Sequence, residues 1–557
     1  MLAGVKCGKR NGDVRIGLAC ALMTTQKDET TVWLTGWKET FAVGPLLLAM
    51  VLGLQWLGGA YESEFGSHPD EAGHYVTGLV VRDYVAAGFP GNPLSYAKNY
   101  YNHYPKVALG HWPPFFYVMQ SAWTLVFSPS RGSLLVFMAV LTTLTALTLF
   151  LFLKPEFGRG KALAGAVLFL ALPLVQQSAG AVMTEIPMTL LILLATVFWG
   201  RYLERERMVD ALGFGLLASL AILTKFSGFV LAFMAPLSLL LTRKFHLLKR
   251  ASFWWPVVMV AVLCGPWILA TLKLADEVAE VGWGWAFTRK AAPYYLWKVY
   301  VAVGAGVILL GIVGAVVRAF RKGPAKRPAG LWAAAGAMLA GILLLHMIVP
   351  CGYEARHLIP ALSVTVLFAV AGGDWLGGWL VRRGLIPNPA FVFVFGVAAL
   401  AFAAEIFRVP QKGYQGFGLV AETLLRNPEA SKSVFMISSD ARGEGMFISE
   451  VARREQRPGH VVRRGSKDLA SSSWSGFGYQ PKLTDEQSVI GLLRTNRVEY
   501  LVVDKSLGSG GRRGYHDLLE RTVETNPARF LPAGRFPIQR NGEWRTNGIV
   551  LYRLGVD

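Results

Sequence analysis

The sequence predicts an α-helical protein that crosses a membrane many times and carries a small α/β domain at its C-terminal end. Of its 557 residues, 53% are hydrophobic and only 17% are charged, a balance that soluble proteins of this size rarely show. Apolar runs of about 18 to 22 residues, the length of a membrane-spanning helix, recur up to residue 407. From residue 408 onward the chain is polar, and short β-like runs alternate with amphipathic helical patterns, which is typical of an α/β domain.

These observations divide the chain into three parts. Residues 1–40 are polar and mixed in composition, and we expect them to form a cytoplasmic tail. Residues 41–407 form the predicted membrane domain, which includes a long outer loop at 61–131. Residues 408–557 are long enough to bury a core of their own, and we expect this domain to lie outside the membrane.

Window hydropathy predicts about eleven spans within the membrane domain. The predicted spans are residues 41–59, 133–152, 163–182, 186–200, 211–224, 226–242, 253–272, 294–317, 331–349, 358–375 and 391–407. One further apolar run, 113–127, has 15 residues and starts with Pro-Pro. Because this run is too short to cross a bilayer, we expect it to lie along the outer interface.

The formal net charge of +20 is best explained by membrane orientation. Basic residues fill alternate loops between the predicted spans, at 154–161, 201–207, 243–250, 318–327 and 382–383. The positive-inside rule makes that side cytoplasmic, where these residues also contact anionic lipid headgroups, so the charge does not indicate nucleic acid. We therefore predict a multi-pass protein of the cytoplasmic (inner) membrane. Its outer, periplasmic face would carry the loops at 61–112, 184–187, 275–293 and 350–357, the junction 224–226 and the C-terminal domain.

The C-terminal domain shows the strand and helix patterns of a mixed fold. Strands are predicted at 434–437, 460–462, 500–503 and 549–552, and helices at 446–454 and 485–493. Other common functional motifs are not found in the chain. The four cysteines form no CxxC pair, which indicates neither a disulfide framework nor a zinc site. The stretch GSGGRRG (508–514) lacks the Gly-Lys-Ser/Thr ending of a phosphate-binding loop.

Charged residues instead collect at the outer ends of different predicted spans. These residues are Asp70, Glu71, Glu185, Lys225, Glu354, Arg356 and His357. A carboxylate can take a proton from an acceptor group, while Lys and Arg neutralise a leaving phosphate. Each residue also has a purely structural interpretation, because acidic side chains favour helix N-termini and basic side chains anchor spans in the headgroups.

Five short motifs, taken in order, resemble the GT-C fold glycosyltransferases. The motifs are HPDEAGHY (68–75), HWPPFFY (111–117), MTEIPMTL (183–190), LTKFSG (223–228) and YEARHLIPALS (353–363). They are similar to the outer-loop and late-span segments of the protein O-mannosyltransferases and the 4-amino-arabinose lipid A transferases. None is specific alone, but all five follow the family's order on a topology derived separately from the charges.

The resemblance implies a GT-C fold and an inverting transfer of a sugar from a polyprenyl-phosphate carrier to an acceptor at the outer face. It implies that Asp70 is the base, with Glu71 and Glu185 as further catalytic carboxylates. Lys225 and Arg356 would hold the donor phosphate. The carrier lipid explains why such chemistry belongs at a bilayer surface, because the membrane delivers the donor.

The chain departs from the lipid A branch at one position. A Lys commonly precedes the Pro-Pro there, whereas this chain has Trp112. Either Lys106 takes its place at the donor phosphate, or Lys225 and Arg356 suffice without it. Acceptor or sugar contacts are expected from His74, His111, Tyr117 and His357. His111 falls near a position that can hold a metal ligand in that branch, which leaves a divalent metal open, and the sequence indicates no other cofactor.

The main alternative is a polytopic transporter or a flippase for lipid-linked saccharides. Transporters often show internal repeats and broken spans in matching halves, and no repeat is found in this sequence. An oligosaccharide polymerase or ligase and a non-enzymatic scaffold also stay open. The sequence does not indicate which sugar is moved, or whether the acceptor is a lipid, a protein or a glycan.

Overall fold

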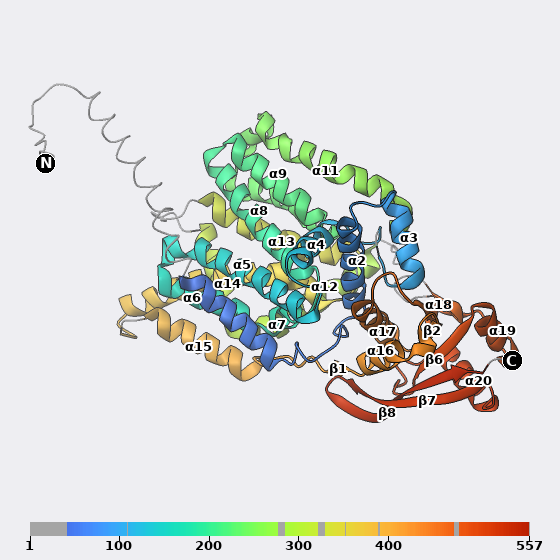
Figure 1. The fold of residues 1–557 in the computed structure, drawn as a ribbon. Coiled ribbons are helices and arrows are strands. Elements are labelled where there is room, and N and C mark those ends of the chain that lie inside the picture. The colour runs from blue at the N-terminus through green and yellow to red at the C-terminus, as the bar shows by residue number, and fades with distance from the viewer. Residues whose placement is uncertain are drawn as a thin grey trace, which may run out of the picture.

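The structure is a computed structural model that describes residues 42–108, 110–276, 284–320, 329–350, 352–387, 390–472 and 478–555. The predicted tail at 1–40 lies outside these ranges, as does part of the predicted outer loop at 275–293. Figure 1 shows a bundle of helices followed by a C-terminal domain built around a sheet.

Six described helices are long and apolar enough to cross a membrane. They are α5 (Arg131–Phe157), α8 (Glu185–Arg205), α11 (Ala251–Asp276), α12 (Trp285–Phe320), α13 (Ala329–Ile348) and α14 (Ile359–Arg382). A seventh span is formed if the bent pair α6 (Arg159–Ala171) and α7 (Pro173–Ala179) counts as one. The bend of 69° falls at Pro173, where the chain loses a backbone N–H and a new helix begins.

Four shorter apolar helices complete the bundle. They are Ala42–Leu57, α9 (Met208–Ile222), α10 (Val230–Thr242) and α15 (Ala390–Glu405). All eleven predicted spans fall on these long, bent and short helices, and the structure alone does not fix how many of them cross the bilayer. Helix α12 packs closely on α14 through glycine: a Cβ on Gly314 would lie 2.0 Å from the Phe368 carbonyl oxygen, and one on Gly372 would lie 1.9 Å from that of Leu310. Small residues of this kind let spanning helices approach backbone to backbone.

The predicted outer loop forms three helices, α2 (Pro69–Ala86), α3 (Pro93–His103) and α4 (Phe115–Val126). The run 113–127, which was expected along the interface, contains α4, and its 12 residues are too few to cross a bilayer. Helix α4 packs on α2 where Gly78 leaves room, since a Cβ there would lie 2.0 Å from Nε2 of Gln120.

The C-terminal domain contains a six-stranded sheet in the order β1-β7-β8-β6-β2-β3. Its strands are β1 (Tyr414–Gln415), β2 (Val434–Ser438), β3 (Val461–Arg464), β6 (Val498–Asp504), β7 (Phe530–Arg540) and β8 (Glu543–Leu554). Strands β3, β2 and β6 run parallel, whereas β8, β7 and β1 join through antiparallel pairs. The helices of this domain are α16 (Phe417–Arg426), α17 (Ala441–Arg454), α18 (Gly465–Asp468), α19 (Glu486–Thr495) and α20 (Gly514–Thr525). A separate small sheet pairs β4 (Ala470–Ser471) with β5 (Gln480–Pro481).

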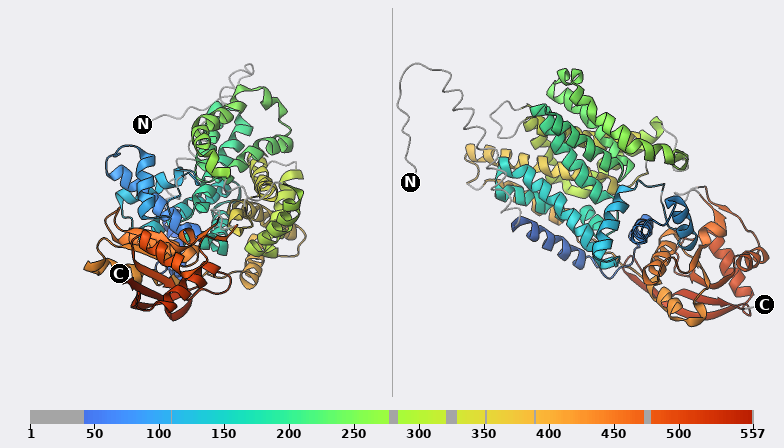
Figure 2. Two further views of the ribbon diagram at one scale, coloured as in Figure 1. Left: turned by 90° about the vertical axis from the view of Figure 1, so that its right-hand side faces the viewer. Right: turned by 45° about the horizontal axis from the view of Figure 1, so that its top comes forward.

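The four predicted strand runs fall on β2, β3, β6 and β8, and the two predicted helices fall on α17 and α19. The sequence did not predict β7, because Pro532, Gly534 and Pro537 interrupt its β-like pattern. Helix α17 packs against α2, so the C-terminal domain sits at one end of the bundle beside the outer-loop helices (Figures 1 and 2).

Candidate active site

Four of the predicted site residues lie at the starts of separate helical segments. Asp70 is in the first turn of α2, where Pro69 opens the helix. His68 Nδ1 lies 3.1 Å from the Asp70 amide nitrogen and 3.3 Å from Asp70 Oδ2, so it caps the amide when neutral and pairs with the carboxylate when protonated. Glu185 is the first residue of α8. Lys225 precedes the 3₁₀ turn η1 (Phe226–Phe229), and Arg356 lies in the 3₁₀ turn η3 (Ala355–Leu358) that leads into α14.

These four side chains form one network of ion pairs. Arg356 Nη2 lies 3.0 Å from Asp70 Oδ2, and its Nη1 lies 3.4 Å from Glu185 Oε1. Lys225 Nζ donates to the same Glu185 oxygen at 2.7 Å. The Nε of Arg356 pairs with Glu354, so one guanidinium contacts three carboxylates. The structure therefore brings together the acid and basic residues that the motifs placed on different spans.

The network is only partly closed to solvent. The Glu185 side chain is fully buried, whereas 16% of Arg356, 21% of Lys225 and 27% of Asp70 stay exposed. Both cations and Asp70 therefore keep part of their side chains accessible to solvent, whereas Glu185, which contacts both cations, does not.

Local charges keep Asp70 ionised. Burial alone would raise the pKa of Asp70, but the hydrogen bond and charge of His68 and the charge of Arg356 outweigh it and hold that pKa well below its ordinary value. Glu354 behaves in the same way: burial is outweighed by His68 and Arg356, so the pKa of Glu354 is lowered. His68 Nε2 lies 3.5 Å from Glu354 Oε2, which places the capping histidine between the two carboxylates.

Aromatic rings line α2 one turn after Asp70. His74 Nδ1 is 2.8 Å from the Tyr117 hydroxyl oxygen, and its ring lies 4.0 Å from the Trp112 ring, centroid to centroid. Gly73 makes this stacking possible, because a Cβ there would lie 3.1 Å from the indole. Burial lowers the pKa of His74 to about 3, so this imidazole is neutral at physiological pH. His74 and Tyr117 therefore share a buried patch on the Asp70 side of α2.

The remaining predicted contacts lie in two places. His357 is buried beside Arg356; its Nδ1 is 3.4 Å from the Tyr295 hydroxyl oxygen, and its ring stacks on His346 with centroids 5.1 Å apart. His111 is half-buried in the turn before α4. Within the described residues no group of three His, Cys, Asp or Glu side chains is arranged to hold a metal ion.

Glu71 and Lys106 contact other groups. Glu71 is fully buried and points to Lys412, whose Nζ is 2.6 Å from its Oε1. Lys106 is 8% exposed and donates to the Pro69 carbonyl oxygen at 3.2 Å. Burial, together with Arg464, lowers the pKa of Lys106 to about 7. Within the described residues, Arg356 forms its ion pairs with Asp70, Glu185 and Glu354, so Glu71 and Lys106 are not among its partners.

Sequence reasoning missed several neighbours of the site. It named Glu354 only among the charged span ends, it did not connect His68 or Lys412 to the two carboxylates of α2, and it did not place Trp112 against His74. One signal was available, since a polar residue directly before Pro69 is typical of a helix cap. The Lys412 contact joins residues 341 positions apart, and no spacing rule predicts such a pair.

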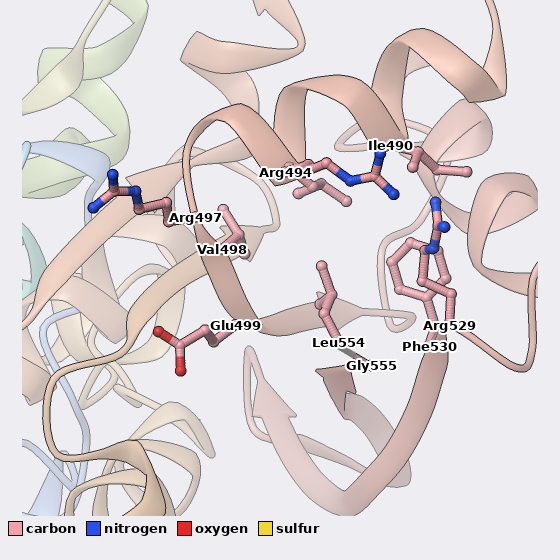
Figure 3. A pocket seen from close by; sticks show the side chains of 10 residues that line it. Ile490, Arg494, Arg497, Val498, Glu499, Arg529, Phe530, Leu554 and Gly555 are labelled. Atoms are coloured by element: carbon pink, nitrogen blue, oxygen red, sulfur yellow. The ribbon is translucent and has the colours of Figure 1, made fainter. Parts of the chain in front are cut away.

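A cavity of about 340 Å³ lies away from this network, in the C-terminal domain. It is lined by α19, the start of β6 and β7, and the end of β8, and Figure 3 shows Arg494 and Arg529 beside Phe530 and Leu554. None of the predicted site residues lines this cavity, so size alone does not identify the site of chemistry.

One known family model matches part of the membrane domain. Residues 111–269 match the family model described as dolichyl-phosphate-mannose-protein mannosyltransferase. This segment contains Glu185 and Lys225, whereas Asp70 and Arg356 lie on either side of it. A sequence search among curated proteins finds no match.

Two solved structures share the fold over nearly the whole chain. ArnT from Cupriavidus metallidurans, bound to undecaprenyl phosphate, has a TM-score of 0.57 and 13% identity, covering 93% of this chain and 100% of that one. The oligosaccharyltransferase of Archaeoglobus fulgidus has a TM-score of 0.53 and 14% identity, covering 91% of this chain and 74% of that one. These structures show that this chain has the GT-C fold, as the motifs predicted, and the family model matches one segment of it.

Proposed function

We propose that this protein transfers a sugar from a polyprenyl-phosphate carrier to an acceptor hydroxyl at the outer face of the cytoplasmic membrane, with inversion at the anomeric carbon. The observation that carries the proposal is the contact of one guanidinium, Arg356, with both Asp70 and Glu185, beside Lys225. The solved relatives support the donor class, since one is bound to undecaprenyl phosphate and the archaeal enzyme was also solved with a dolichol-phosphate.

In the proposed reaction, Asp70 acts as the general base. The acceptor oxygen attacks the anomeric carbon as its proton passes to the Asp70 carboxylate, and the bond from that carbon to the phosphate oxygen breaks. The leaving polyprenyl phosphate keeps the bonding electron pair. Such a displacement needs one base and a group that stabilises the leaving charge, and it inverts the configuration.

Lys225 and Arg356 are proposed to hold the donor phosphate. Both contact Glu185, whose side chain is fully buried. The charge of Glu185 therefore orients the two cations and leaves their exposed sides to the phosphate. Arg suits this role because its planar fork can bind a carboxylate and a phosphate through separate N–H groups. Lys106 is left out of the donor site, because its ammonium is buried against the Pro69 carbonyl.

Donor binding would also activate the base. Arg356 is one of the groups that hold the pKa of Asp70 below its ordinary value, which makes Asp70 a weak base in the empty site. A phosphate that shares Arg356 reduces this effect and raises the pKa of Asp70 toward the range where a base is effective. The proposal therefore includes an order of events, with the donor bound before the acceptor loses its proton.

The sugar and acceptor are proposed to contact the surfaces beside Asp70. His74 lies one turn along α2 from Asp70 and contacts Tyr117 of α4, and His357 lies beside Arg356. Neutral imidazole and phenol groups can hydrogen-bond sugar hydroxyls without competing for the phosphate. The outer-face location follows from the basic loops, which the positive-inside rule assigns to the cytoplasm.

A donor panel tests the proposed function. Purified protein in liposomes is given radiolabelled polyprenyl-phosphate sugars one at a time, with candidate lipid, peptide and glycan acceptors, and the labelled products are identified. We expect a labelled acceptor with one donor class and no product from Asp70→Asn. Movement of intact donor across the bilayer without any labelled acceptor would instead support a flippase.

A further inference from the structure

We propose that Lys412 is a positioning residue that sets the distance between the helices carrying Asp70 and Glu185. This inference rests on the proposed function and deepens it, because it assigns a role in catalysis to the segment that leads into the C-terminal domain. It also gives Glu71 a structural partner in place of a direct part in the chemistry.

Glu71 lies at a junction of three segments. Its Oε2 accepts hydrogen bonds from the Ser67 amide at 3.0 Å and the Ser67 hydroxyl at 2.7 Å. Its Oε1 accepts from the Val182 amide at 3.2 Å and from Lys412 Nζ at 2.6 Å. With four donors on a fully buried side chain, the Glu71 carboxylate is saturated.

Lys412 connects the same segments from the other side. Its Nζ donates to the Gly180 carbonyl oxygen at 3.0 Å as well as to Glu71. Only 8% of the Lys412 side chain is exposed. The contacts with Glu71 and Gly180 therefore offset the cost of burying its charge. The Lys412 backbone amide is fixed as well, because it donates to the Gly58 carbonyl oxygen at 2.8 Å.

These contacts lie close in sequence to Asp70 and Glu185. Glu71 is the neighbour of Asp70 on α2, and Gly180 and Val182 belong to the turn that leads into Glu185 at the start of α8. Lys412 therefore ties the first turn of α2 to the segment that follows α7 and leads into Glu185. Asp70 and Glu185 both contact Arg356, so a change in the spacing of these turns changes how Arg356 is shared between them.

The location of Lys412 links the C-terminal domain to this geometry. Lys412 lies between the end of α15 and strand β1. Two residues later, the Tyr414 carbonyl oxygen accepts a hydrogen bond from the Glu64 amide at 2.7 Å, and the Tyr414 amide donates to the Ser63 hydroxyl at 3.1 Å. The chain thus enters the C-terminal domain along the loop that precedes α2. Lys412 lies in this segment and contacts both Glu71 of α2 and Gly180, which precedes α8.

Transfer kinetics of Lys412 variants test the inference. Lys412→Met removes the charge and both hydrogen bonds, so we expect kcat to fall by about 10- to 100-fold, because misplacement of reacting groups by about 1 Å has effects of that size. We expect KM for the donor to change less than about threefold, because Lys225 and Arg356 are untouched. Lys412→Arg keeps the charge and should recover part of the rate. Lys505→Met, at a 31% exposed lysine that pairs with Glu524, is the matched control and should behave as the wild type.

A second variant tests the inference if the first one does not fold. If Lys412→Met does not fold, Glu71→Gln keeps the shape of the side chain and weakens the same contact. We expect it to lower kcat, and combining it with Lys412→Arg should give a non-additive effect, since the two residues share one interaction. Wild-type kcat in Lys412→Met, or in Glu71→Gln when that variant is used, would overturn the inference. Two further measurements separate the proposals: full transfer by Asp70→Asn would overturn only the role of Asp70 as the base, whereas no transfer by the wild type with any donor would overturn the proposed function itself.

Discussion

Arg356 has the most partners of the residues at the site. Its Nη2, Nη1 and Nε face Asp70, Glu185 and Glu354 respectively. A lysine in its place would supply a point charge and could not hold three carboxylates in fixed directions. The guanidinium thus explains how residues from α2, α8 and the start of α14 keep a common geometry.

The pH dependence of transfer tests the proposed link between Arg356 and Asp70. The base works unprotonated, so the rate falls as the pH drops through the pKa of Asp70. In the free enzyme that pKa is held below its ordinary value, and a phosphate on Arg356 should raise it. Because kcat/KM reports the free enzyme and kcat reports the donor complex, we expect the acidic limb of kcat at a higher pH than that of kcat/KM. Coincident limbs, or limbs in the reverse order, would contradict this link.

Sequence reasoning identified the charged residues of the site but not all their contacts. Glu185, Lys225 and Arg356 could be predicted because each stands where an apolar run begins, and Asp70 because it follows the first such run; the basic loops assign those ends to one side. The pairing of Glu71 with Lys412 could not be predicted in the same way. It depends on how the loop before α2 meets the chain after α15, and neither hydropathy nor local motifs encode that contact.

Helix α2 carries Asp70 and is held from two sides. On one side α4 packs on it at Gly78, and on the other α17 from the C-terminal domain contacts it. Helix α4 is itself anchored near the donor site, because the Phe115 amide donates to the Leu223 carbonyl oxygen at 2.8 Å. The position of Asp70 therefore depends on the packing of α2 as a whole element.

Gly78→Ala tests this packing. The added methyl would lie 2.0 Å from Nε2 of the buried Gln120, so the Gln120 side chain or α4 must shift, and overpacking of this kind costs about 1–3 kcal/mol. We expect a lower midpoint of thermal unfolding and reduced transfer. Gly491→Ala on α19 is the matched control, because nothing lies within 4 Å of its Cβ position. Equal midpoints for the two variants would show that the α2–α4 contact is not tight.

Elements were predicted best where one physical pattern dominates. The apolar spans were found because length and hydropathy suffice to identify a helix in a membrane. The buried strands β2 and β6 were found because they are short runs of apolar residues. Strand β7 and the first half of β8 are largely exposed, so burial imposes no clear pattern on their sequence.

At the scale of the whole molecule, the proposal requires the active site and the C-terminal domain to face away from the cytoplasm. Helix α17 packs on α2, so the C-terminal domain and Asp70 must lie on the same side of the membrane. The basic loops, among them the one that contains Arg250, are predicted on the other side. Labelling of one residue in the C-terminal domain and one in a basic loop can therefore test whether they lie on opposite sides of the membrane.

Cysteine labelling tests this orientation. The four native cysteines are replaced, and a single cysteine is introduced at Glu524 or at Arg250, whose side chains are 65% and 51% exposed. In intact cells we expect a membrane-impermeant maleimide to label Glu524→Cys, and to label Arg250→Cys only after the membrane is opened. Labelling of Arg250→Cys alone in intact cells would place the active site on the cytoplasmic side.

The most direct test of the central claim compares donor binding with transfer in Asp70→Asn. With the donor identified by the panel, we expect this variant to bind the donor within about threefold of the wild type and to transfer sugar about 10²- to 10⁴-fold more slowly, the range typical of losing a general base. Asp517→Asn, at a side chain that is 58% exposed, should match the wild type in both measurements. Wild-type transfer by Asp70→Asn, or an equal loss of binding and transfer, would contradict the role of Asp70 as the base of a glycosyl transfer.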